Sequence, residues 1–490
     1  MDPIAPTYED LEALVKQNYE HPNLELIREA YDLAKRAHEG KKRESGHPFI
    51  SHPVATAYKI AEMRLGMNVI AAGLLHDVVE DTSYSKEDLE AQFGTDIAEL
   101  VESVTKLKEI KYQGADRYLE NLRRMFLAFA SDVRVVFIKF SDRLHNLKTL
   151  YARSEEKQQR VAREVIEIYA PIASRLGMGE MKGDLEDTAF AYAYPDQYNQ
   201  TLEIYEASVS PIKPYVKEII NITSDLLREN GITVLSVHGR AKRIYSLFKK
   251  LQRYDSDIKK IYDLVAIRVI VGDVAECYTA LGILHGKWTP LPGRIKDYIS
   301  QPKPNGYQSL HTTVFCDEGH IVEFQVRTQE MHEVAEFGVA AHWRFKETGS
   351  QKAKSVRWME ELAIIQKEVS SKKDYLDKLE RMKIDIFRDR IFVFTPKGDV
   401  IDLPEQATPV DFAYNIHTDI GDKAVAAKIN DKMANLDTEL ISGDICEIII
   451  DKNRRTPNAD WLKFVKTNHA RIKIKAATKK SVKGWLARHR

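Results

Sequence analysis

The sequence has few cysteines, no long apolar run and no net charge. Its three cysteines, Cys277, Cys316 and Cys446, are far apart and form neither a Cys-x-x-Cys pair nor a disulfide framework, which favours a reducing cytoplasm. No apolar run approaches membrane-spanning length, and the N-terminus has acids but no apolar core, which excludes a signal peptide. The 73 basic and 73 acidic residues balance, so no global attraction to nucleic acid follows. We expect a soluble, cytoplasmic protein without a membrane partner.

Positive charge is nevertheless concentrated at the C-terminal end. Residues 452–490 contain 13 lysines and arginines but one acid, Asp460. Such a tail is either a solvated helix or linker or a contact with RNA or ribosomal phosphate. The length of 490 residues and the hydrophobic content of 43% predict two to four folded units.

The N-terminal part, from Tyr8 to about Tyr194, has the apolar spacing of helices and no strand-like alternation. Within it, residues 74–82 read Leu-Leu-His-Asp-Val-Val-Glu-Asp-Thr. On one helix, His76 and Asp77 would lie a turn before Glu80 and Asp81, on shared faces. A buried helix with a polar end is the alternative to a metal site, but burying four ionisable groups without a ligand is costly. The stretch is therefore a candidate site for metal-dependent hydrolysis.

Two further segments supply candidate ligands. Gly46, Pro48 and Pro53 predict a turn that brings His52 to the start of a helix, although a histidine before proline is often only a loop residue. Farther along, Asp142 and Asn146 lie four residues apart, on one face of a predicted helix.

The motifs His-Pro-x-x-x-Ala from His52, LLHDVVEDT (74–82) and SDRLHNLKTL (141–150) resemble the HD-superfamily metal phosphohydrolases, and more closely the hydrolase domain of the Rel/SpoT family, which makes and degrades the alarmone (p)ppGpp. The resemblance implies hydrolysis of the 3′-diphosphate of (p)ppGpp. It implies a Mn²⁺ ion held by His52, His76, Asp77 and Asp142, with Glu80 and Asp81 activating water and with Arg43, Ser45 and Asn146 holding the nucleotide. Glu44 and His47 depart from the family pattern of Lys and Glu, so nucleotide affinity or guanine selectivity is expected to differ.

The central part has strand character. Residues 234–239 predict a short strand, and a helix is expected to open at Gly239, with Arg240, Lys242 and Lys250 among its cations. These cations either meet a polyphosphate or cover an exposed helix. Residues 263–271 predict a buried strand headed by Asp263, which is well placed for Mg²⁺.

The loop 294–311 mixes cations with an aromatic ring and Asn-Gly. Tyr307 is a candidate for base stacking, and phosphates would be reached by Lys296, Lys303 and His311. The strand 321–328 alternates, so that Glu323, Gln325 and Arg327 share a face. Glu323 becomes a partner for Asp263 if the two strands are neighbours.

With residues 335–343, these segments resemble the synthetase domain of the same family, whose mixed sheet flanked by helices is similar to nucleotidyltransferases. The resemblance implies transfer of pyrophosphate from ATP to the 3′-hydroxyl of GDP or GTP. Arg240 and Arg268 would sandwich adenine, Asp263 and Glu323 would handle Mg²⁺ and the hydroxyl, and Tyr307 would stack on guanine. The other implied nucleotide contacts are Lys242, Lys250, Lys296, Lys303, Asn305, His311 and Gln325. The Arg-Ile-Lys-Asp quartet (294–297) matches bifunctional members.

The C-terminal part begins with a charged helical stretch. After it, residues 391–404 predict a hairpin with a Pro-Lys-Gly-Asp turn, and the segment to Ile450 resembles a TGS domain, a β-grasp module. The resemblance implies binding to the ribosome and uncharged tRNA, with His417 at the tRNA end; a compact spacer is the alternative. We expect Arg490 to lie inside a further helical segment of a longer protein.

The sequence thus predicts a multidomain α and α+β protein. The expected parts are an all-α HD-type hydrolase domain (1–195), a mixed-sheet synthetase domain (196–345), a helical linker (346–385), a TGS domain (386–450) and the start of a basic helical region (451–490). A bifunctional enzyme is the main hypothesis, and we expect its two sites to work in antagonism. The alternatives are a single retained activity with a regulatory second domain, and an RNA- or ribosome-binding protein.

Overall fold

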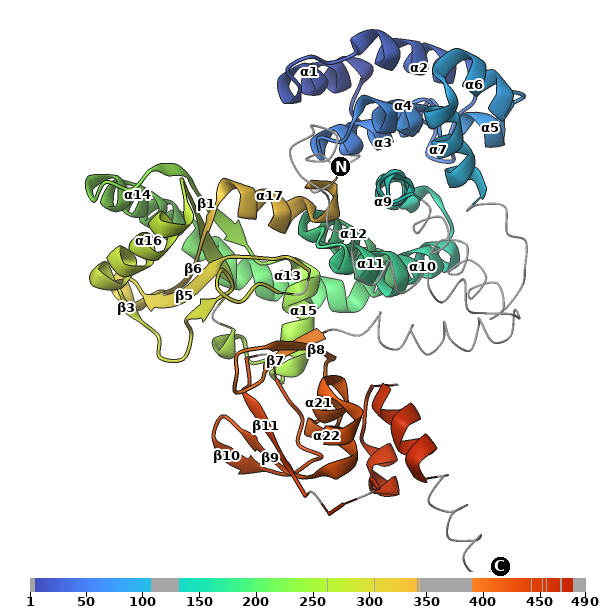
Figure 1. Ribbon diagram of the computed structural model, residues 1–490. Coiled ribbons are helices and arrows are strands. Elements are labelled where there is room, and N and C mark those ends of the chain that lie inside the picture. The colour runs from blue at the N-terminus through green and yellow to red at the C-terminus, as the bar shows by residue number, and fades with distance from the viewer. Residues whose placement is uncertain are drawn as a thin grey trace, which may run out of the picture. The chain divides into compact units, whose positions relative to one another are not determined.

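The computed structural model describes residues 5–106, 132–343 and 390–478, apart from 262, 304, 342, 442, 452, 455 and 468. The chain divides into two compact units, Met1–Glu368 and Val369–Arg490 (Figure 1). The first unit contains a helical half, residues 5–194, and a sheet half, residues 195–343. The predicted linker 346–385 and the last twelve residues lie outside the described parts.

The helical half is built from helices alone, as predicted; its described residues include one isolated β-bridge, between Lys42 and Pro48, and no strand. The helices are α1 (Tyr8–Asn18), α2 (Leu24–Ala37), α3 (Ser51–Glu62), α4 (Met67–Leu75), α5 (Val78–Asp81), α6 (Lys86–Phe93), α7 (Thr95–Lys106), α9 (Arg134–Lys148), α10 (Glu155–Glu164), α11 (Ala170–Arg175) and α12 (Gly179–Ala193). A short 3₁₀ turn (Leu150–Ala152) precedes α10, and a π-helical turn (Val165–Tyr169) joins α10 to α11.

Helices α3, α4 and α9 form the centre of this half. Helix α3 packs on both α4 and α9, and α2 and α7 close around α4. Helix α9 is buried along most of its length, and α4 is buried from Val69 to Leu75. Helices so apolar on every side belong in a protein interior, and any polar side chain on them is carried inside with them.

The helix predicted across residues 74–82 is interrupted, which corrects that prediction. Helix α4 ends at Leu75 and α5 begins at Val78, with His76 and Asp77 in a turn between them. The His76 ring nitrogen Nδ1 lies 2.8 Å from the carbonyl oxygen of Gly73. A continuing helix would need that carbonyl for the amide of Asp77. The break turns the His76 ring inward and separates it from Glu80 and Asp81, which remain exposed.

The sheet half is a mixed sheet, as predicted. Its strand order is β1-β2-β6-β5-β3, with β4 paired to β5; β2 and β6 run parallel and the other pairs run antiparallel. The strands are β1 (Val234–Ala241), β2 (Val265–Val271), β3 (Thr289–Pro290), β4 (Lys296–Asp297), β5 (Leu310–Phe315) and β6 (Ile321–Thr328). The helices are α13 (Pro195–Val209), α14 (Lys213–Glu229), α15 (Ile244–Arg253), α16 (Val274–Lys287) and α17 (Gln329–Phe337).

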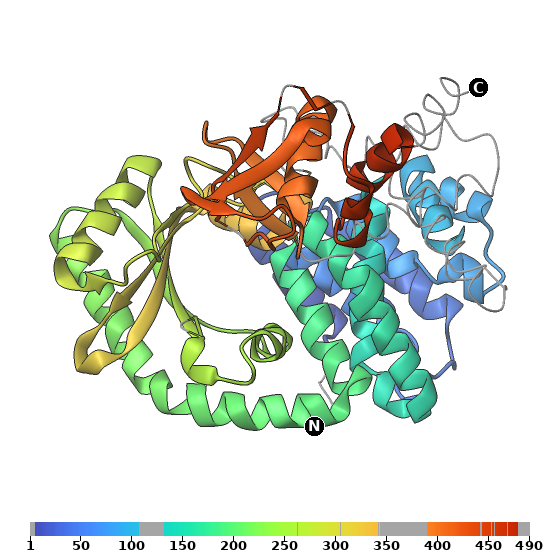
Figure 2. The same ribbon diagram turned by 90° about the horizontal axis from the view of Figure 1, so that it is seen from below.

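Helices cover the sheet on opposite faces. Helices α14 and α16 pack on one face, over a core that includes Ile267, Val269 and Phe324. Helix α17 contacts β2 and β6 on the other face, where Arg268 points. Figure 2 shows α13 and α14 as the green helical connection from the helical half to the sheet. Strand β2 is thus buried on both faces, which explains its continuous apolar sequence.

The helix expected from Gly239 begins five residues later, and this is a second correction. Strand β1 continues to Ala241, which pairs with Val265 of β2, and the amide of Lys242 still donates to the carbonyl of Leu264. The sheet therefore uses the backbone groups that a helix would need, and α15 starts only at Ile244. As a result Arg240 extends from a strand and Lys242 from the connection that follows it.

Gly338, at the end of α17, joins the two halves. Its φ is +54°, and a Cβ atom there would collide with Leu176 and Gly177 of the turn after α11. The amide of Val339 donates to the carbonyl of Leu176 over 2.9 Å. Only a glycine permits both the backbone angle and this close approach, so α17 is anchored to the helical half.

The second unit contains the predicted hairpin, β7 (Arg390–Phe394) and β8 (Val400–Pro404), and a three-stranded sheet of order β10-β9-β11. The remaining elements are α21 (Pro409–Ile416), α22 (Thr418–Lys423), β9 (Ala424–Ile429), β10 (Lys432–Ala434), β11 (Cys446–Ile450) and a 3₁₀ turn (Ala459–Lys463). The buried carboxylate of Asp411 caps α21 and accepts hydrogen bonds from Lys466 and Thr467, which holds the following segment against the helix. Among the described residues, no helix has the length and apolar character needed to cross a membrane.

Candidate active sites

Four predicted ligands converge inside the helical half. His52 lies in the first turn of α3, His76 and Asp77 lie in the turn between α4 and α5, and Asp142 lies on α9; each is at most 3% exposed. Nε2 of His52 is 3.2 Å from Nε2 of His76 and 3.3 Å from Oδ1 of Asp142. Oδ2 of Asp77 is 3.2 Å from Nε2 of His76 and 3.5 Å from Nε2 of His52. Donor atoms of His52, His76 and Asp142 all lie within 4.8 Å of one another, and Asp77 adjoins the two histidines.

These separations fit a divalent metal ion. Bonds of about 2.1 Å, spread at about 90–110°, place neighbouring donor atoms roughly 3.0–3.4 Å apart. Burial lowers the pKa of His52 to about 4, so the imidazole is neutral and its lone pair is available. Two imidazoles and two carboxylates suit a borderline-hard divalent ion.

Three neighbours orient these ligands, and sequence reasoning missed two of them. Nδ1 of His145 lies 2.9 Å from Nδ1 of His52, which directs Nε2 of His52 toward the other donors. Nζ of Lys139 lies 2.8 Å from Oδ2 of Asp142, and Nδ2 of Asn146 donates to Oδ1 of the same carboxylate. Lys139 and His145 flank Asp142 three residues away on the same helix, so helical spacing would have found them.

The predicted nucleotide contacts of the helical half lie beside this cluster. Nη2 of Arg43 donates to Oδ1 of Asn146 over 2.6 Å, which links the loop to the ligand-bearing helix α9. The hydroxyl of Ser45 is buried and has no hydrogen-bond partner among the described residues. Glu44 forms ion pairs with Arg153 (3.1 Å) and Lys157 (3.5 Å). Position 44 therefore carries a carboxylate that neutralises neighbouring cations.

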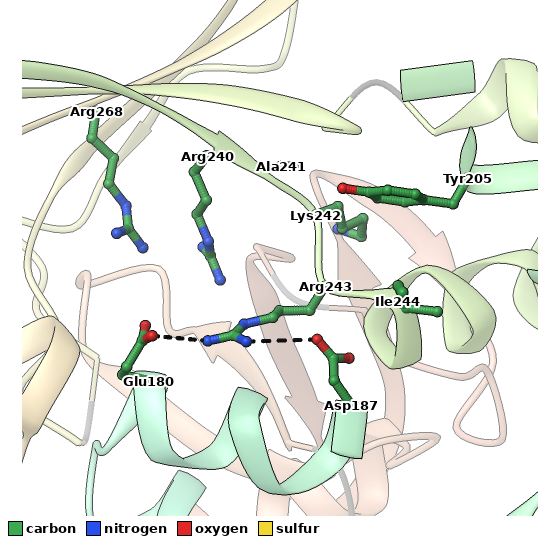
Figure 3. A pocket seen from close by; sticks show the side chains of 9 residues that line it. All are labelled: Glu180, Asp187, Tyr205, Arg240, Ala241, Lys242, Arg243, Ile244 and Arg268. Atoms are coloured by element: carbon green, nitrogen blue, oxygen red, sulfur yellow. Dashed lines mark hydrogen bonds and ion pairs between the residues drawn. The ribbon is translucent and has the colours of Figure 1, made fainter. Parts of the chain in front are cut away.

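In the sheet half, a pocket of about 420 Å³ lies between the end of β1 and α12 (Figure 3). Arg240 and Arg268 extend into it from the sheet, and Arg243 lies between Glu180 and Asp187. Its lining residues are Glu180, Asp187, Tyr205, Arg240, Ala241, Lys242, Arg243, Ile244 and Arg268. Two guanidinium groups on one side of such a cavity can enclose a planar base.

Asp263 lies at the edge of this pocket, between two lysines. Nζ of Lys242 and Nζ of Lys250 are each 2.6 Å from its Oδ2. Burial acts to raise the pKa of Asp263, but the two lysine charges lower it to about 2. Its other oxygen, Oδ1, is buried and has no hydrogen-bond partner among the described residues. An ionised carboxylate with one unused oxygen fits a Mg²⁺ ligand beside polyphosphate.

Glu323 lies on β6, beside the strand β2 that begins two residues after Asp263, so the strands are neighbours as the predicted partnership required. Strands β2 and β6 are neighbours, with Ala266 opposite Glu323. Oε1 of Glu323 is 2.7 Å from Nδ1 of His311, whose Nε2 is 2.7 Å from the Tyr307 hydroxyl. Burial acts to raise the pKa of Glu323, but the hydrogen bond from His311 lowers it. The three side chains form a chain from an aromatic ring to an ionised carboxylate.

Two aromatic rings lie close to Lys303, another predicted phosphate contact. Nζ of Lys303 lies 4.5 Å from the centre of the Tyr298 ring and 4.9 Å from that of Tyr307. Burial lowers the pKa of Lys303 to about 8. Sequence reasoning did not single out Tyr298. It placed Arg327 only on the face of Glu323, whereas the structure buries Arg327 with Nε and Nη1 lacking hydrogen-bond partners among the described residues.

The other predicted contacts lie on β4, on β6, in the loop before β5 or in the second unit. Lys296 pairs with His311 across β4 and β5, and Asn305 accepts a hydrogen bond from the amide of Tyr307. The Gln325 side chain accepts from Arg327 over 3.4 Å. In the second unit, His417 is exposed, and its Nδ1 accepts from the amide of Asp419 at the start of α22.

Comparison with known proteins agrees with these parts. The family model of the HD domain matches residues 30–179, a model described as a region found in RelA / SpoT proteins matches residues 239–350, and the TGS domain model matches residues 391–450. The chain is 44% identical to the guanosine-3′,5′-bis(diphosphate) 3′-pyrophosphohydrolase of Aquifex aeolicus, over 96% of this chain and 67% of that protein. The chain belongs to the RelA/SpoT family. The HD match spans the three segments that carry the buried donor atoms.

Other members of the RelA/SpoT family carry names for both directions of the chemistry. The chain is 42% identical to the bifunctional (p)ppGpp synthase/hydrolase SpoT of Escherichia coli, over 96% of this chain and 67% of that protein. It is also 42% identical to the GTP pyrophosphokinase of Streptomyces coelicolor, over 97% of this chain and 58% of that protein. The chain spans about two thirds or less of these relatives.

The contact between His145 and His52 leads to a prediction about metal affinity. In His145→Phe, the ring keeps its volume but no longer orients His52, so affinity for a divalent ion should fall by roughly 10–100-fold. Calorimetric titration of the metal-free protein with Mn²⁺ measures this. The matched control is His285→Phe, which removes a histidine that contacts Thr312 in the sheet half. Equal affinity in wild type and His145→Phe would show that His145 does not support the ligand.

Proposed function

We propose that this chain both makes and degrades (p)ppGpp. In the synthetic direction it transfers pyrophosphate from ATP to the 3′-hydroxyl of GDP or GTP; in the other it hydrolyses the 3′-diphosphate and releases pyrophosphate. The observation that carries the proposal is the presence of two complete and different acid-base groups in one compact unit, namely the buried donor cluster of the helical half and Asp263 between its lysines. The names of the relatives describe the same two reactions. We assign hydrolysis to residues 1–195 and synthesis to 196–345.

In the hydrolase, we assign His52, His76, Asp77 and Asp142 to a Mn²⁺ ion. The ion supplies Lewis acidity and lowers the pKa of a bound water. The chain itself contributes the remaining functions. Arg43 and Asn146 hold the nucleotide near the cluster, with the Ser45 hydroxyl as a further donor. Glu80 and Asp81, exposed on the turn after Asp77, accept the proton of the attacking water as the bond from the 3′-oxygen to phosphorus breaks.

In the synthetase, we assign the pocket of Figure 3 to ATP. Arg240 and Arg268 enclose the adenine, and Lys242, Lys250 and Lys303 neutralise the phosphates, with Lys296 nearby. Asp263 and Glu323 hold Mg²⁺, which neutralises charge on the transferred group when it is bound.

The acceptor nucleotide binds at Tyr307, whose ring stacks on guanine, with Asn305 and Gln325 as polar contacts. Glu323 takes the proton of the 3′-hydroxyl while that oxygen attacks the β-phosphorus of ATP and AMP leaves. His311 keeps Glu323 ionised and aligned for this step. Such catalysis depends mostly on positioning and on charge neutralisation.

Single substitutions should separate the two activities. Asp77→Ala removes one donor of the buried cluster, and Asp263→Ala removes the carboxylate between two lysines. We expect pyrophosphate release from ppGpp with Mn²⁺ to be lost only in Asp77→Ala. Formation of ppGpp from ATP and GDP with Mg²⁺ should be lost only in Asp263→Ala. Each loss should exceed about 100-fold, because the removed group contacts the reacting centre.

Ion-exchange chromatography of the nucleotides measures both reactions, with circular dichroism to establish that each variant is folded. Supplying Mn²⁺, Mg²⁺ and Zn²⁺ separately tests the metal assignments. A folded wild type that is inactive in one assay would contradict the bifunctional proposal and favour a regulatory role for that domain. Inactivity in both assays would favour an RNA-binding protein.

The lowered pKa of Lys303 predicts a pH dependence of synthesis. Lys303 carries its charge below a pKa of about 8 and loses it above that value. If the charge holds the donor phosphates, kcat/KM for synthesis should decline above pH 8, by about tenfold for each further pH unit. Arginine stays charged throughout this range. Burial lowers the pKa of Lys242 to about 8 as well. Lys303→Arg should therefore make the decline less steep, and an unchanged profile would assign the decline to Lys242 or another group.

We also propose that residues 386–450 contact the ribosome and uncharged tRNA, with His417 at the tRNA end. The TGS match and the exposed position of His417 support this. His417→Ala should weaken binding of uncharged tRNA to the full chain by about tenfold in a filter-binding assay, as for a stacking side chain. His469→Ala, at another exposed histidine of the same unit, is the control. Equal tRNA binding by wild type and His417→Ala would contradict the contact.

We also propose that the protein is cytoplasmic, because the proposed reactions use ATP and guanine nucleotides. The three cysteines are buried and unpaired, as expected in a reducing compartment.

A further inference from the structure

One face of α12 forms a binding site for Arg243, a side chain of the sheet half. Gly183 and Asp184 lie three and four residues after Glu180, and Asp187 lies four and three residues after them, so the four residues share a side of the helix. Nη2 of Arg243 lies 3.0 Å from Oε1 of Glu180 and 2.9 Å from Oδ1 of Asp184, and its Nη1 lies 3.6 Å from Oδ2 of Asp187. We call these four residues the Arg243 socket.

Gly183 forms the floor of the socket. A Cβ atom at position 183 would stand 2.6 Å from Nε and 3.0 Å from Cζ of Arg243, closer than non-bonded atoms approach. Glycine is intrinsically unfavourable inside a helix. Its presence in the middle of α12 is explained by the guanidinium group, which lies directly on the helix surface there.

The socket controls the connection that carries the groups of the pocket. Arg243 directly follows Lys242, which forms an ion pair with Asp263. Arg240 lies three residues before Arg243 and is the second-to-last residue of β1. Oδ1 of Asp187 also accepts the amide of Tyr245 over 3.0 Å, in the first turn of α15. Both the end of β1 and the start of α15 are thereby fixed to α12.

The carboxylate of Asp184 also forms an ion pair with α3, the helix whose first turn carries His52. Oδ2 of Asp184 lies 2.9 Å from Nζ of Lys59, while its Oδ1 holds Arg243. Lys59 lies on α3, two turns after the ligand His52. Asp184 is thus bonded on one side to the helical half and on the other to the connection beside the pocket.

Stable packing of the helical half against the sheet half does not require these ion pairs. Partly buried ion pairs usually give little net stability compared with apolar contacts of similar size, but they define one geometry. Three carboxylates surround the guanidinium group of Arg243, and Gly183 leaves room for it because glycine has no side chain. Together they fix the direction of the Arg243 side chain. The charge of Arg243 is already satisfied by α12, which leaves the phosphates to Lys242 and Lys250.

We propose that Arg243 is a positioning residue for the ATP pocket, and that its socket on α12 sets the placement of Arg240 and Lys242 from the helical half. This rests on the proposed function, in which the pocket binds ATP. Arg243 lines the pocket, but its guanidinium group is bound by the carboxylates of α12, so its proposed effect on ATP acts through Arg240 and Lys242. Displacing it should weaken ATP binding and leave the acceptor site, built on β5 and β6, largely unaffected.

Gly183→Ala tests the proposal, because it adds one methyl group beneath Arg243 without removing any charge. In the full chain, we expect the KM for ATP to rise about tenfold, since small displacements of positioning groups have effects of this order or larger. The KM for GDP and the rate of ppGpp hydrolysis should change by less than about twofold. Gly282→Ala is the matched control, because Gly282 lies inside α16 with nothing within 4 Å of the added atom.

The dissociation constant of α,β-methylene-ATP, measured by calorimetry, separates the two proposals, because it reports on the pocket without turnover. Weaker binding in Gly183→Ala, with wild-type binding in Gly282→Ala, supports the positioning role. Unchanged binding in folded Gly183→Ala overturns that role and leaves the proposed function intact. Failure of wild type to bind the analogue overturns the ATP assignment, and the positioning role with it.

A second variant, Lys59→Met, approaches the socket from the helical half and also serves if Gly183→Ala does not fold. It frees one oxygen of Asp184 and should raise the same dissociation constant about threefold, as expected when one charged partner of a network is removed. Lys86→Met is its control, because it removes an ion pair with Glu102 elsewhere in the helical half. If Lys59→Met and Lys86→Met bind the analogue equally, the helical half does not act on the pocket through Asp184, and the proposal fails.

Discussion

In the interior of the helical half, Nε2 of His52 lies within 3.5 Å of the imidazole of His76 and of the carboxylates of Asp77 and Asp142, and the packing of the surrounding helices has to accommodate these four polar groups. Uncompensated carboxylates in such a place would be strongly unfavourable. Lys139 neutralises part of the charge of Asp142, and burial keeps His52 uncharged. The remaining negative charge is what a divalent cation would neutralise, so structure and metal binding are linked through the same groups.

The sheet half solves the opposite electrostatic problem. The polyphosphate site proposed for this half would require a concentration of positive charge, and the lysines and arginines that provide such charge repel one another. Asp263 relieves part of this repulsion by accepting Lys242 and Lys250 on one oxygen, and the other oxygen stays unbonded within the described residues. Glu336 does the same for Arg268, at 2.9 Å. Cations held by carboxylates in this way are ordered in advance, which lowers the cost of arranging them around a ligand.

Helix α12 connects these two environments. Its apolar side, including Leu185 and Phe190, is buried, while its acidic side faces a lysine of α3 and an arginine beside β1. Because α12 forms ion pairs both with α3 and with the connection beside the pocket, a movement of one of these segments can be transmitted to the other. The antagonism expected between the two sites remains a prediction, and the bonds of Asp184 show one physical route by which a shift of α3 would be felt near the pocket.

Local sequence was sufficient for most elements and for naming the candidate site residues. Apolar spacing predicted the all-helical half, continuous apolar runs predicted β2, and alternation placed Glu323, Gln325 and Arg327 on one face of β6. The candidate metal ligands were named from short motifs and from the family resemblance that these motifs carry. These features depend on neighbours within about ten residues, and such information is contained in the sequence itself.

Tertiary structure decided what depends on distant partners. The pairing of Ala241 with Val265 extended β1 through residues expected to be helical, and His76, at the break in a helix expected to be continuous, meets His52, which lies 24 residues earlier in the chain. The contact of His145 with His52 spans 93 residues, and Gly183 has its function only because Arg243 lies on it. The sequence determined which chemical groups are available and on which elements they lie. Folding decided which of them meet, because contacts between remote segments depend on the packing of the whole unit.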